Sequence, residues 1–161
     1  MMNRHTIAVL VNDQPGVLQR VSGLFGRRGF NIESITVGQS EEVGLSRMVI
    51  VTLGDEKLLE QIEKQLYKLI DVIKVVNLSS NPMVGRELAL IKVKADPSER
   101  PEVMGLVETF RASVVDIGNT SLMVQVVGDT EKIDAMIELL KPYGIRELSR
   151  TGVTAMIRGN V

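Results

Sequence analysis

The chain has 161 residues, of which 44% are hydrophobic and only 3% aromatic, so its core must be built mainly from aliphatic side chains. Its 19 Lys and Arg residues nearly balance its 20 Asp and Glu residues, and the resulting net charge of −1 argues against nucleic acid as the main partner. Cysteine is absent, which excludes disulfide bonds and cysteine-ligated metals.

The first half of the chain alternates between strand and helix patterns. Apolar residues recur with the strand period or the helical period in successive windows. Strands are predicted at 5–11, 31–39, 46–53 and 72–78, and helices at 15–28 and from Asp55 to about residue 70. The predicted order of this unit is therefore β-α-β-β-α-β.

The second half repeats this order after a polar, proline-containing joint at residues 79–82. Strands are predicted at 87–95, 113–118, 121–127 and 145–149, helices from Pro101 and after Asp129, and residues 153–157 could extend the last strand. A Gly-Asp pair precedes the second helix of each half, at residues 54–55 and 128–129, and its Asp is the expected N-cap. Split β-α-β repeats fold as an antiparallel sheet with two helices on one face. The sequence therefore predicts an α+β chain of two ferredoxin-like βαββαβ units, residues 1–78 and 83–161.

The most informative stretch is the junction between the first strand and the first helix. Asn12 or Asp13 could cap this helix, Pro15 suits its first turn, and Gly29 suits a left-handed C-terminal end. Gly16 has no Cβ, so another molecule can approach the backbone, and free N–H groups at a helix start suit a small carboxylate. The alternative is an ordinary capped helix without a ligand.

Motifs for catalysis, nucleic-acid binding or membrane insertion are weak. His5 is the only histidine, and a lone histidine at this position is expected to lie on the surface. No Ser, His and Asp have the spacing of a catalytic set, and no G-x-x-x-x-G-K phosphate loop is present. Residues 26–29, Gly-Arg-Arg-Gly, match the GXXG loop of KH domains, but a strand pattern follows where that fold needs a helix. With no signal-peptide pattern and no bilayer-spanning apolar run, we expect a cytoplasmic protein with no membrane or nucleic-acid partner.

Residues 9–18, Val-Leu-Val-Asn-Asp-Gln-Pro-Gly-Val-Leu, resemble the start of an ACT domain, a small ligand-binding regulatory module. The stretches that follow resemble one ACT family more narrowly, the regulatory small subunits of acetolactate synthase (acetohydroxyacid synthase). These stretches are residues 20–25, 28–35, 45–48, 54–57 and 61–66. Phe110-Arg111 and Arg150-Thr151-Gly152 resemble the C-terminal domain of the family less specifically.

The resemblance implies a non-catalytic subunit with an effector-binding, dimerising ACT domain at 1–78 and a C-terminal ferredoxin-like regulatory domain at 83–161. It implies a catalytic subunit as partner, which carries thiamine diphosphate, Mg and FAD, and feedback inhibition by valine or another branched-chain amino acid. No cofactor or metal is expected on this chain. The effector would lie between the ACT domains of a homodimer. One chain would contribute Asn12, Asp13, Gln14, Pro15, Gly16, Val17 and Leu18, and its partner Asn31 and Ile32.

Two other functions remain open at this stage. The first is a free-standing ACT-type amino-acid sensor that regulates a different enzyme. The second is an enzyme on a ferredoxin-like scaffold, against which the missing acid–base pair argues. The homodimer has independent support, because the predicted edge strand at 31–39 contains no lysine or proline to protect it from pairing.

Overall fold

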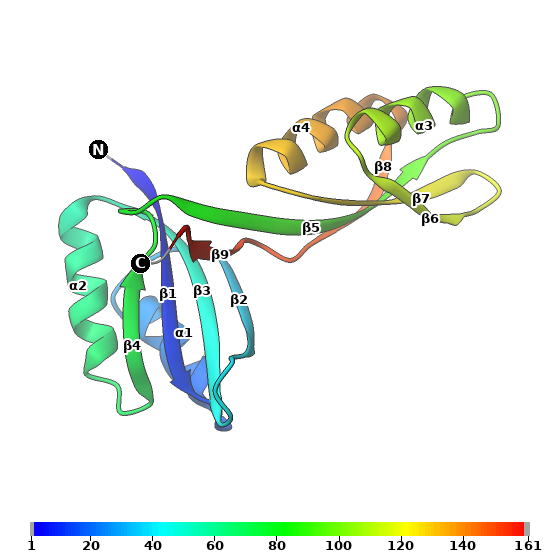
Figure 1. The fold of residues 1–161 in the computed structure, drawn as a ribbon. Coiled ribbons are helices and arrows are strands. Elements are labelled where there is room, and N and C mark those ends of the chain that lie inside the picture. Colours follow the sequence, from blue (N-terminus) through cyan, green and yellow to red (C-terminus); the bar gives the residue numbers. More distant parts are fainter. Residues whose placement is uncertain (1, 160–161) are drawn as a thin grey trace. The chain divides into compact units, whose positions relative to one another are not determined.

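The computed structural model describes residues 2–159, which form two compact units. The first unit runs to Val84 and resumes at Val153, and the second is Gly85–Gly152. The elements of the first unit are β1 (Asn3–Asn12), α1 (Val17–Arg27), β2 (Ile32–Gln39), β3 (Leu45–Gly54), α2 (Glu56–Tyr67), β4 (Val72–Asn77) and β9 (Thr154–Ile157). Those of the second are α3 (Arg100–Thr109), β6 (Ser113–Ile117), β7 (Ser121–Gly128), α4 (Thr130–Leu140), a 3-10 turn (Lys141–Tyr143) and β8 (Ile145–Arg150). Strand β5 (Met83–Lys94) runs from the first unit into the second (Figure 1).

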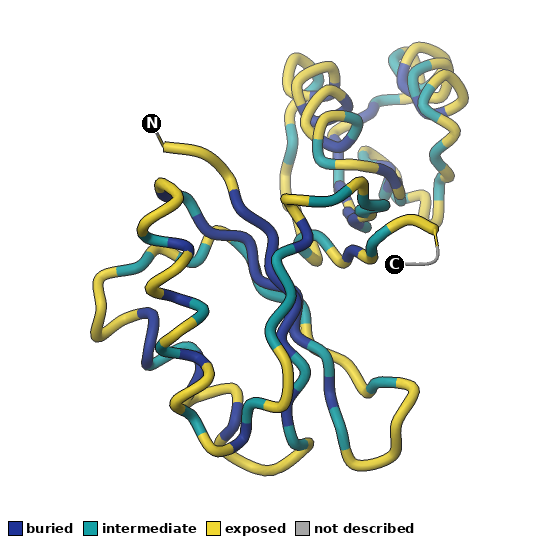
Figure 2. Tube along the Cα trace, turned by 60° about the vertical axis from the view of Figure 1, so that its left-hand side comes forward, coloured by how far each residue is buried: buried dark blue, intermediate teal, exposed yellow. Residues whose placement is uncertain are grey.

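Each unit contains the predicted ferredoxin-like sheet. The strand order is β2-β3-β1-β4 in the first unit and β6-β7-β5-β8 in the second, and every strand pair along these orders is antiparallel. In the first sheet Val9 lies opposite Met48 on one side and Val75 on the other. The two central strands are the most buried part of the unit (Figure 2). The α+β prediction of two βαββαβ units is confirmed.

The first core lies between the sheet and the two helices. Its buried side chains come from alternate positions of β1 and β3 and from the inner faces of α1 and α2, as the helical and strand periods predict. They are Ile7, Val9, Val11, Val17, Val21, Leu24, Phe25, Met48, Ile50, Leu59, Ile62 and Leu66. Phe25 and Phe30 meet edge to face with their ring centroids 6.0 Å apart, which fixes the end of α1 against the sheet.

The C-terminal end of α1 follows the predicted glycine stop. Gly29 has φ 70°, in the left-handed region. The Phe30 N–H donates to the Phe25 carbonyl at 2.8 Å, and the Gly29 N–H donates to the Gly26 carbonyl at 3.2 Å. This pair of bonds is the Schellman arrangement, which satisfies carbonyls that a helix end otherwise leaves free. Residues 26–29 are thus a helix end and not a loop between two helices.

The opposite face of the first sheet is covered by the C-terminal segment of the chain. Ala155 of β9 is buried against Ala8, Val49 and Leu78, and β9 pairs with β5. The Arg158 N–H donates to the Pro82 carbonyl at 2.9 Å, which holds the segment beyond β9. The predicted extension of the last strand by residues 153–157 is therefore wrong. These residues form a separate strand, whose Ala155 side chain is buried on the first sheet.

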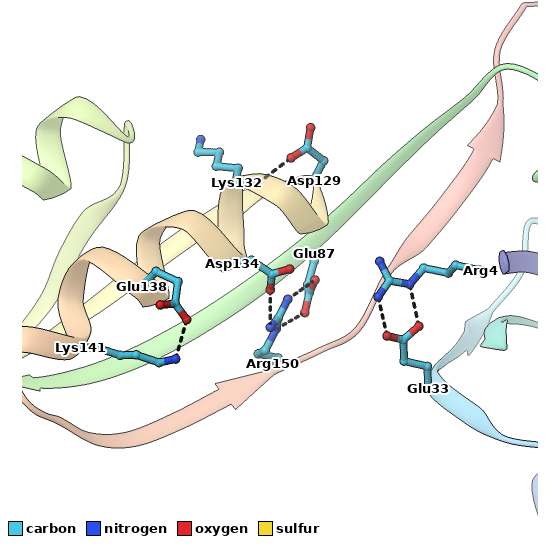
Figure 3. Close-up of polar contacts among 9 residues, drawn as sticks. All are labelled: Arg4, Glu33, Glu87, Asp129, Lys132, Asp134, Glu138, Lys141 and Arg150. Carbon is cyan, nitrogen blue, oxygen red and sulfur yellow. Dashed lines mark hydrogen bonds and ion pairs between the residues drawn. The ribbon is translucent and has the colours of Figure 1, made fainter. Parts of the chain in front are cut away.

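The second unit has its own aliphatic core. In each unit an aspartate caps the second helix. Asp129 accepts a hydrogen bond from the Lys132 N–H at 2.9 Å, and Asp55 accepts one from the Leu58 N–H at 2.8 Å, as predicted for both Gly-Asp pairs (Figure 3 shows the first). The buried Glu87 carboxylate is held by a two-bond contact with Arg150, at 2.6 and 3.0 Å. This ion pair raises the pKa of the Arg150 guanidinium.

The prediction that His5 lies on the surface is wrong. Its side chain is buried, and Nε2 lies 2.9 Å from the Gly54 carbonyl oxygen, so it belongs to the interior of the sheet and not to the surface. Strand β1 begins at Asn3, two residues before the predicted start, and residue 5 is therefore covered by neighbouring elements. An imidazole N–H that donates to a backbone carbonyl is a structural contact.

The two edges of the first sheet differ. At the β4 edge the Tyr67 hydroxyl accepts a hydrogen bond from the Val75 N–H at 2.9 Å and donates to the Val75 carbonyl at 3.3 Å. This side chain occupies backbone groups that a further strand would need. At the β2 edge, no side chain in the described part of the chain bonds the backbone of Ile32–Gln39. The β2 edge is therefore the one open to strand pairing.

Candidate functional site

The loop between β1 and α1 has a conformation that only glycine adopts easily. Gly16 is the N-cap of α1 and has φ 86°, and no side chain among residues 2–159 caps the helix start. The predictions that Asn12 or Asp13 caps the helix and that Pro15 lies in its first turn are wrong, because α1 begins at Val17. The left-handed residue turns the chain so that the helix starts later than its sequence suggests.

Backbone hydrogen bonds to two other turns hold this loop. The Asn12 N–H donates to the Asp71 carbonyl, and the Asp13 N–H donates to the Gly44 carbonyl, each at 2.9 Å. The N–H groups of Gly16, Leu18 and Gln19 donate to no backbone or side-chain acceptor among residues 2–159. A loop held in this way presents free donors at the positive end of a helix, where a carboxylate is favoured.

An arginine lies beside Gly16, and sequence reasoning did not single it out as a site residue. The Arg20 Nη1 atom is 2.8 Å from the position that a Cβ on Gly16 would take. Its Nε donates to Asp71 Oδ2 at 2.8 Å, and only 12% of the Asp71 side chain is exposed. The four-residue spacing from Gly16 to Arg20 could have pointed to Arg20, since such residues share a helix face. Asp71 is 51 residues from Arg20 and has no such signal.

The sequence-predicted residues do not form one cluster within a single chain. Asn12 lies opposite Leu45 at one end of β3, and Ile32 lies opposite Thr52 near the other. The 11 residues of α1 separate the two groups by about 16 Å, at 1.5 Å per residue. Asn31 is exposed, and its backbone carbonyl accepts a hydrogen bond from the Thr52 hydroxyl at 2.5 Å. A ligand as small as an amino acid therefore cannot touch both groups of one chain.

Two matches to family models together span most of the chain. Residues 7–74 match the acetohydroxyacid synthase small subunit-like ACT domain, and residues 86–159 match the small subunit of acetolactate synthase. A probable acetolactate synthase small subunit of Archaeoglobus fulgidus is 55% identical over 157 residues, which cover 98% of each chain. A second, from Methanothermobacter thermautotrophicus, is 57% identical and covers 97% of this chain and 94% of the relative. The chain belongs to the acetolactate synthase small-subunit family.

A solved member of this family has the same fold. The crystal structure of the acetolactate synthase small subunit from Thermotoga maritima superposes with a TM-score of 0.91, at 47% identity over 99% of both chains. The small-subunit relative of Bacillus subtilis is 52% identical over 97% of this chain. Family membership thus extends over both units and is not limited to the ACT domain.

Other features of this family member lie away from the β1–α1 loop. A hollow of about 270 Å³ lies between β2, β3 and β9, on the sheet face opposite the helices, and includes Arg47 and Met156 in its lining. The Arg47 guanidinium bonds the Glu41 carboxylate at 2.7 Å, and this hydrogen bond lowers the pKa of Glu41.

Residues 2–159 contain no group of three or more His, Asp or Glu side chains that could hold a metal ion. Nor does any helix in this range have the length and apolar character needed to cross a membrane.

Proposed function

We propose that this chain is the regulatory subunit of an acetolactate synthase. It binds a catalytic subunit that carries thiamine diphosphate, Mg and FAD, raises the activity of that subunit, and makes it sensitive to inhibition by valine. The observation that carries this proposal is the similarity to acetolactate synthase small subunits along nearly the whole chain, at 50–57% identity. A shared ACT domain alone would support only an amino-acid sensor of some kind.

The valine site is formed by two chains of a homodimer. One chain contributes the β1–α1 loop, Asn12 to Leu18, and the other contributes Asn31 and Ile32. The free N–H groups at the start of α1 favour the effector carboxylate. The separation of the two groups by the length of α1 supports a site that a single chain does not complete.

The homodimer forms by pairing two β2 edges into a continuous sheet. The Tyr67 hydroxyl blocks the β4 edge at Val75, whereas no side chain of the described residues blocks β2. The side chain of Val37 on β2 is 47% exposed, which is consistent with a position that a second chain covers. An open edge strand with apolar side chains pairs readily with a second copy.

The dimer proposal predicts different effects of one substitution at the two edges. Val37→Asp is expected to weaken the dimer, because two carboxylates would be brought together across the paired β2 strands. Ile73→Asp on β4 is the matched control, since Ile73 is 49% exposed and lies on the blocked edge. Sedimentation should show the wild type and Ile73→Asp as dimers at micromolar concentration and Val37→Asp shifted toward monomer. A monomeric wild type, with and without valine, would rule out the dimer.

The direct test of the function is reconstitution with the catalytic subunit. The expected result is faster acetolactate formation on adding this protein, with the added activity lost when valine is also present. A protein that binds valine but leaves the rate of the catalytic subunit unchanged at saturating concentration would instead be a free-standing amino-acid sensor. Turnover by this chain alone would show that it is an enzyme.

A further inference from the structure

We propose that Arg20 is the side chain that recognises the effector carboxylate, and that Asp71 positions it. This inference rests on the proposed valine site and adds the residues that determine which class of ligand the site accepts. It predicts a site selective for amino acids with a free α-carboxylate over the corresponding amides.

Gly16 makes room for this guanidinium. Helical side chains lean toward the helix N-terminus, so the side chain of Arg20, in the second turn of α1, extends back over Gly16. Its Nη1, Cζ and Nη2 atoms lie 2.8, 3.7 and 4.0 Å from the position of a Cβ on Gly16. The missing side chain therefore does more than permit the left-handed turn, because any Cβ there would displace the arginine.

Asp71, the hydrogen-bond partner of Arg20, accepts two hydrogen bonds. Asp71 accepts from Arg20 Nε at 2.8 Å through its side chain and from the Asn12 N–H at 2.9 Å through its backbone carbonyl. The Asp71 side chain is 12% exposed, while that of Arg20 is 48% exposed. The α2–β4 turn is thus bonded both to the β1–α1 loop and to the Arg20 guanidinium, while about half of the Arg20 side chain remains exposed.

The terminal nitrogens of the Arg20 guanidinium are available for a ligand. Among residues 2–159 only Nε donates a hydrogen bond to protein, so Nη1 and Nη2 have their N–H groups free. A planar guanidinium with free terminal nitrogens binds a carboxylate through two parallel hydrogen bonds. The unbonded N–H groups of Leu18 and Gln19 lie at the start of the same helix, where the helix dipole also favours an anion.

The pairing with Asp71 explains why this site would bind a zwitterion and not any anion strongly. The carboxylate of Asp71 balances the charge of Arg20, so the site has little net positive charge to attract inorganic anions. Binding then depends on the geometry of the hydrogen bonds and on apolar contacts of the ligand, such as the 47% exposed side chain of Leu18. A purely structural role for Arg20, tying α1 to the α2–β4 turn, is the competing explanation.

Calorimetric titration of the full-length protein with valine and with valinamide distinguishes these roles. Valinamide keeps the isopropyl group and the amine but lacks the carboxylate. The wild type is expected to bind valine about tenfold to a hundredfold more tightly than valinamide. Arg20→Gln should lower the affinity for valine by a similar factor while leaving valinamide binding unchanged. Arg27→Gln, which removes the same charge from the last turn of α1, should change neither affinity.

Asp71 is tested through its effect on Arg20. If Asp71 acts only by positioning the guanidinium, the double variant Arg20→Gln with Asp71→Asn should bind valine as weakly as Arg20→Gln alone. Arg20→Lys keeps the charge but loses the planar pair of donors, and it should lose about tenfold in valine affinity. This variant serves as the test if Arg20→Gln does not fold.

Three results would overturn the inference. A folded Arg20→Gln protein that still prefers valine over valinamide by the wild-type factor would show that Arg20 does not read the carboxylate. Equal losses for valine and valinamide, with a lower melting temperature, would show a structural role. A wild-type protein that binds no branched-chain amino acid in the presence of its catalytic subunit would remove the proposed effector site itself, and this inference with it.

Discussion

Gly16→Asp is expected to abolish valine inhibition and leave stimulation of the catalytic subunit largely intact. The new carboxylate would lie where the effector carboxylate is expected, beside the Arg20 guanidinium, whose Nη1 is 2.8 Å from the Cβ position and would have to shift to make room. Two like charges 4 Å apart repel by about 4 kcal/mol at an effective dielectric of 20. The affinity for valine should therefore fall by more than about a hundredfold.

The backbone conformation of Gly16 makes this variant less stable than its position at a helix start suggests. Gly16 has φ 86°, so an aspartate there carries backbone strain of about 1–2 kcal/mol, in addition to any gain from an acid at a helix start. Gly144→Asp in the second unit is the matched control, because Gly144 also has a positive φ, 100°, and a Cβ there would make only an ordinary contact. Melting temperatures and inhibition curves of both variants separate strain from loss of the site. Normal valine inhibition in a folded Gly16→Asp protein would disprove the proposed location.

A chain truncated after Ser80 is expected to lose about 3–5 kcal/mol of stability in its ACT domain, by uncovering several apolar side chains at once. The segment that the truncation removes includes Ala155, which is buried on the face formed by Ala8, Val49 and Leu78. The ACT domain that the resemblance implies, residues 1–78, does not include this segment. Without its cover, this sheet exposes an apolar face, and urea denaturation should show a lower midpoint.

The cover can be restored without the second unit. A chain in which a flexible Gly/Ser linker replaces residues 85–152, keeping residues 153–161, should denature at a higher urea concentration than the truncated chain. Within the full-length protein, Ala155→Asp should destabilise the first unit, since Ala155 is 4% exposed, whereas Met156→Asp should not, since Met156 is 69% exposed. Equal denaturation midpoints for the truncated and linker-joined chains would show that the C-terminal segment contributes no stability.

Features governed by local chemistry could be predicted from the sequence. The hydrophobic periods predicted both units, Asp55 and Asp129 were recognised as helix caps, and Gly29 as a left-handed stop. These depend on residues within one or two turns of each other, where spacing determines geometry. The resemblance to known small subunits, and not the periodicity, supplied the function.

Features that depend on distant contacts could not be predicted. The helix start was misplaced because the loop is shaped by bonds to the carbonyls of Gly44 and Asp71, which are far away in sequence. The return of residues 153–157 to the first sheet has no local signal, since a short apolar strand has the same sequence pattern whichever sheet it joins. The pairing of Arg20 with Asp71 could not be predicted for the same reason, because 51 residues separate them in the sequence.

In the proposed dimer, each valine site combines the β1–α1 loop of one chain with Asn31 and Ile32 of another. Mixing two defective variants tests it most directly. Gly16→Asp damages the loop half, and Asn31→Ala removes a polar group from the other half, so each pure dimer has two damaged sites. A mixed dimer has one site with both changes and one site with neither. Titration with valine should therefore show wild-type affinity restored at a fraction of the sites after subunit exchange. If the mixture binds valine no better than the two separate variants, although exchange has occurred, the site is not shared between chains.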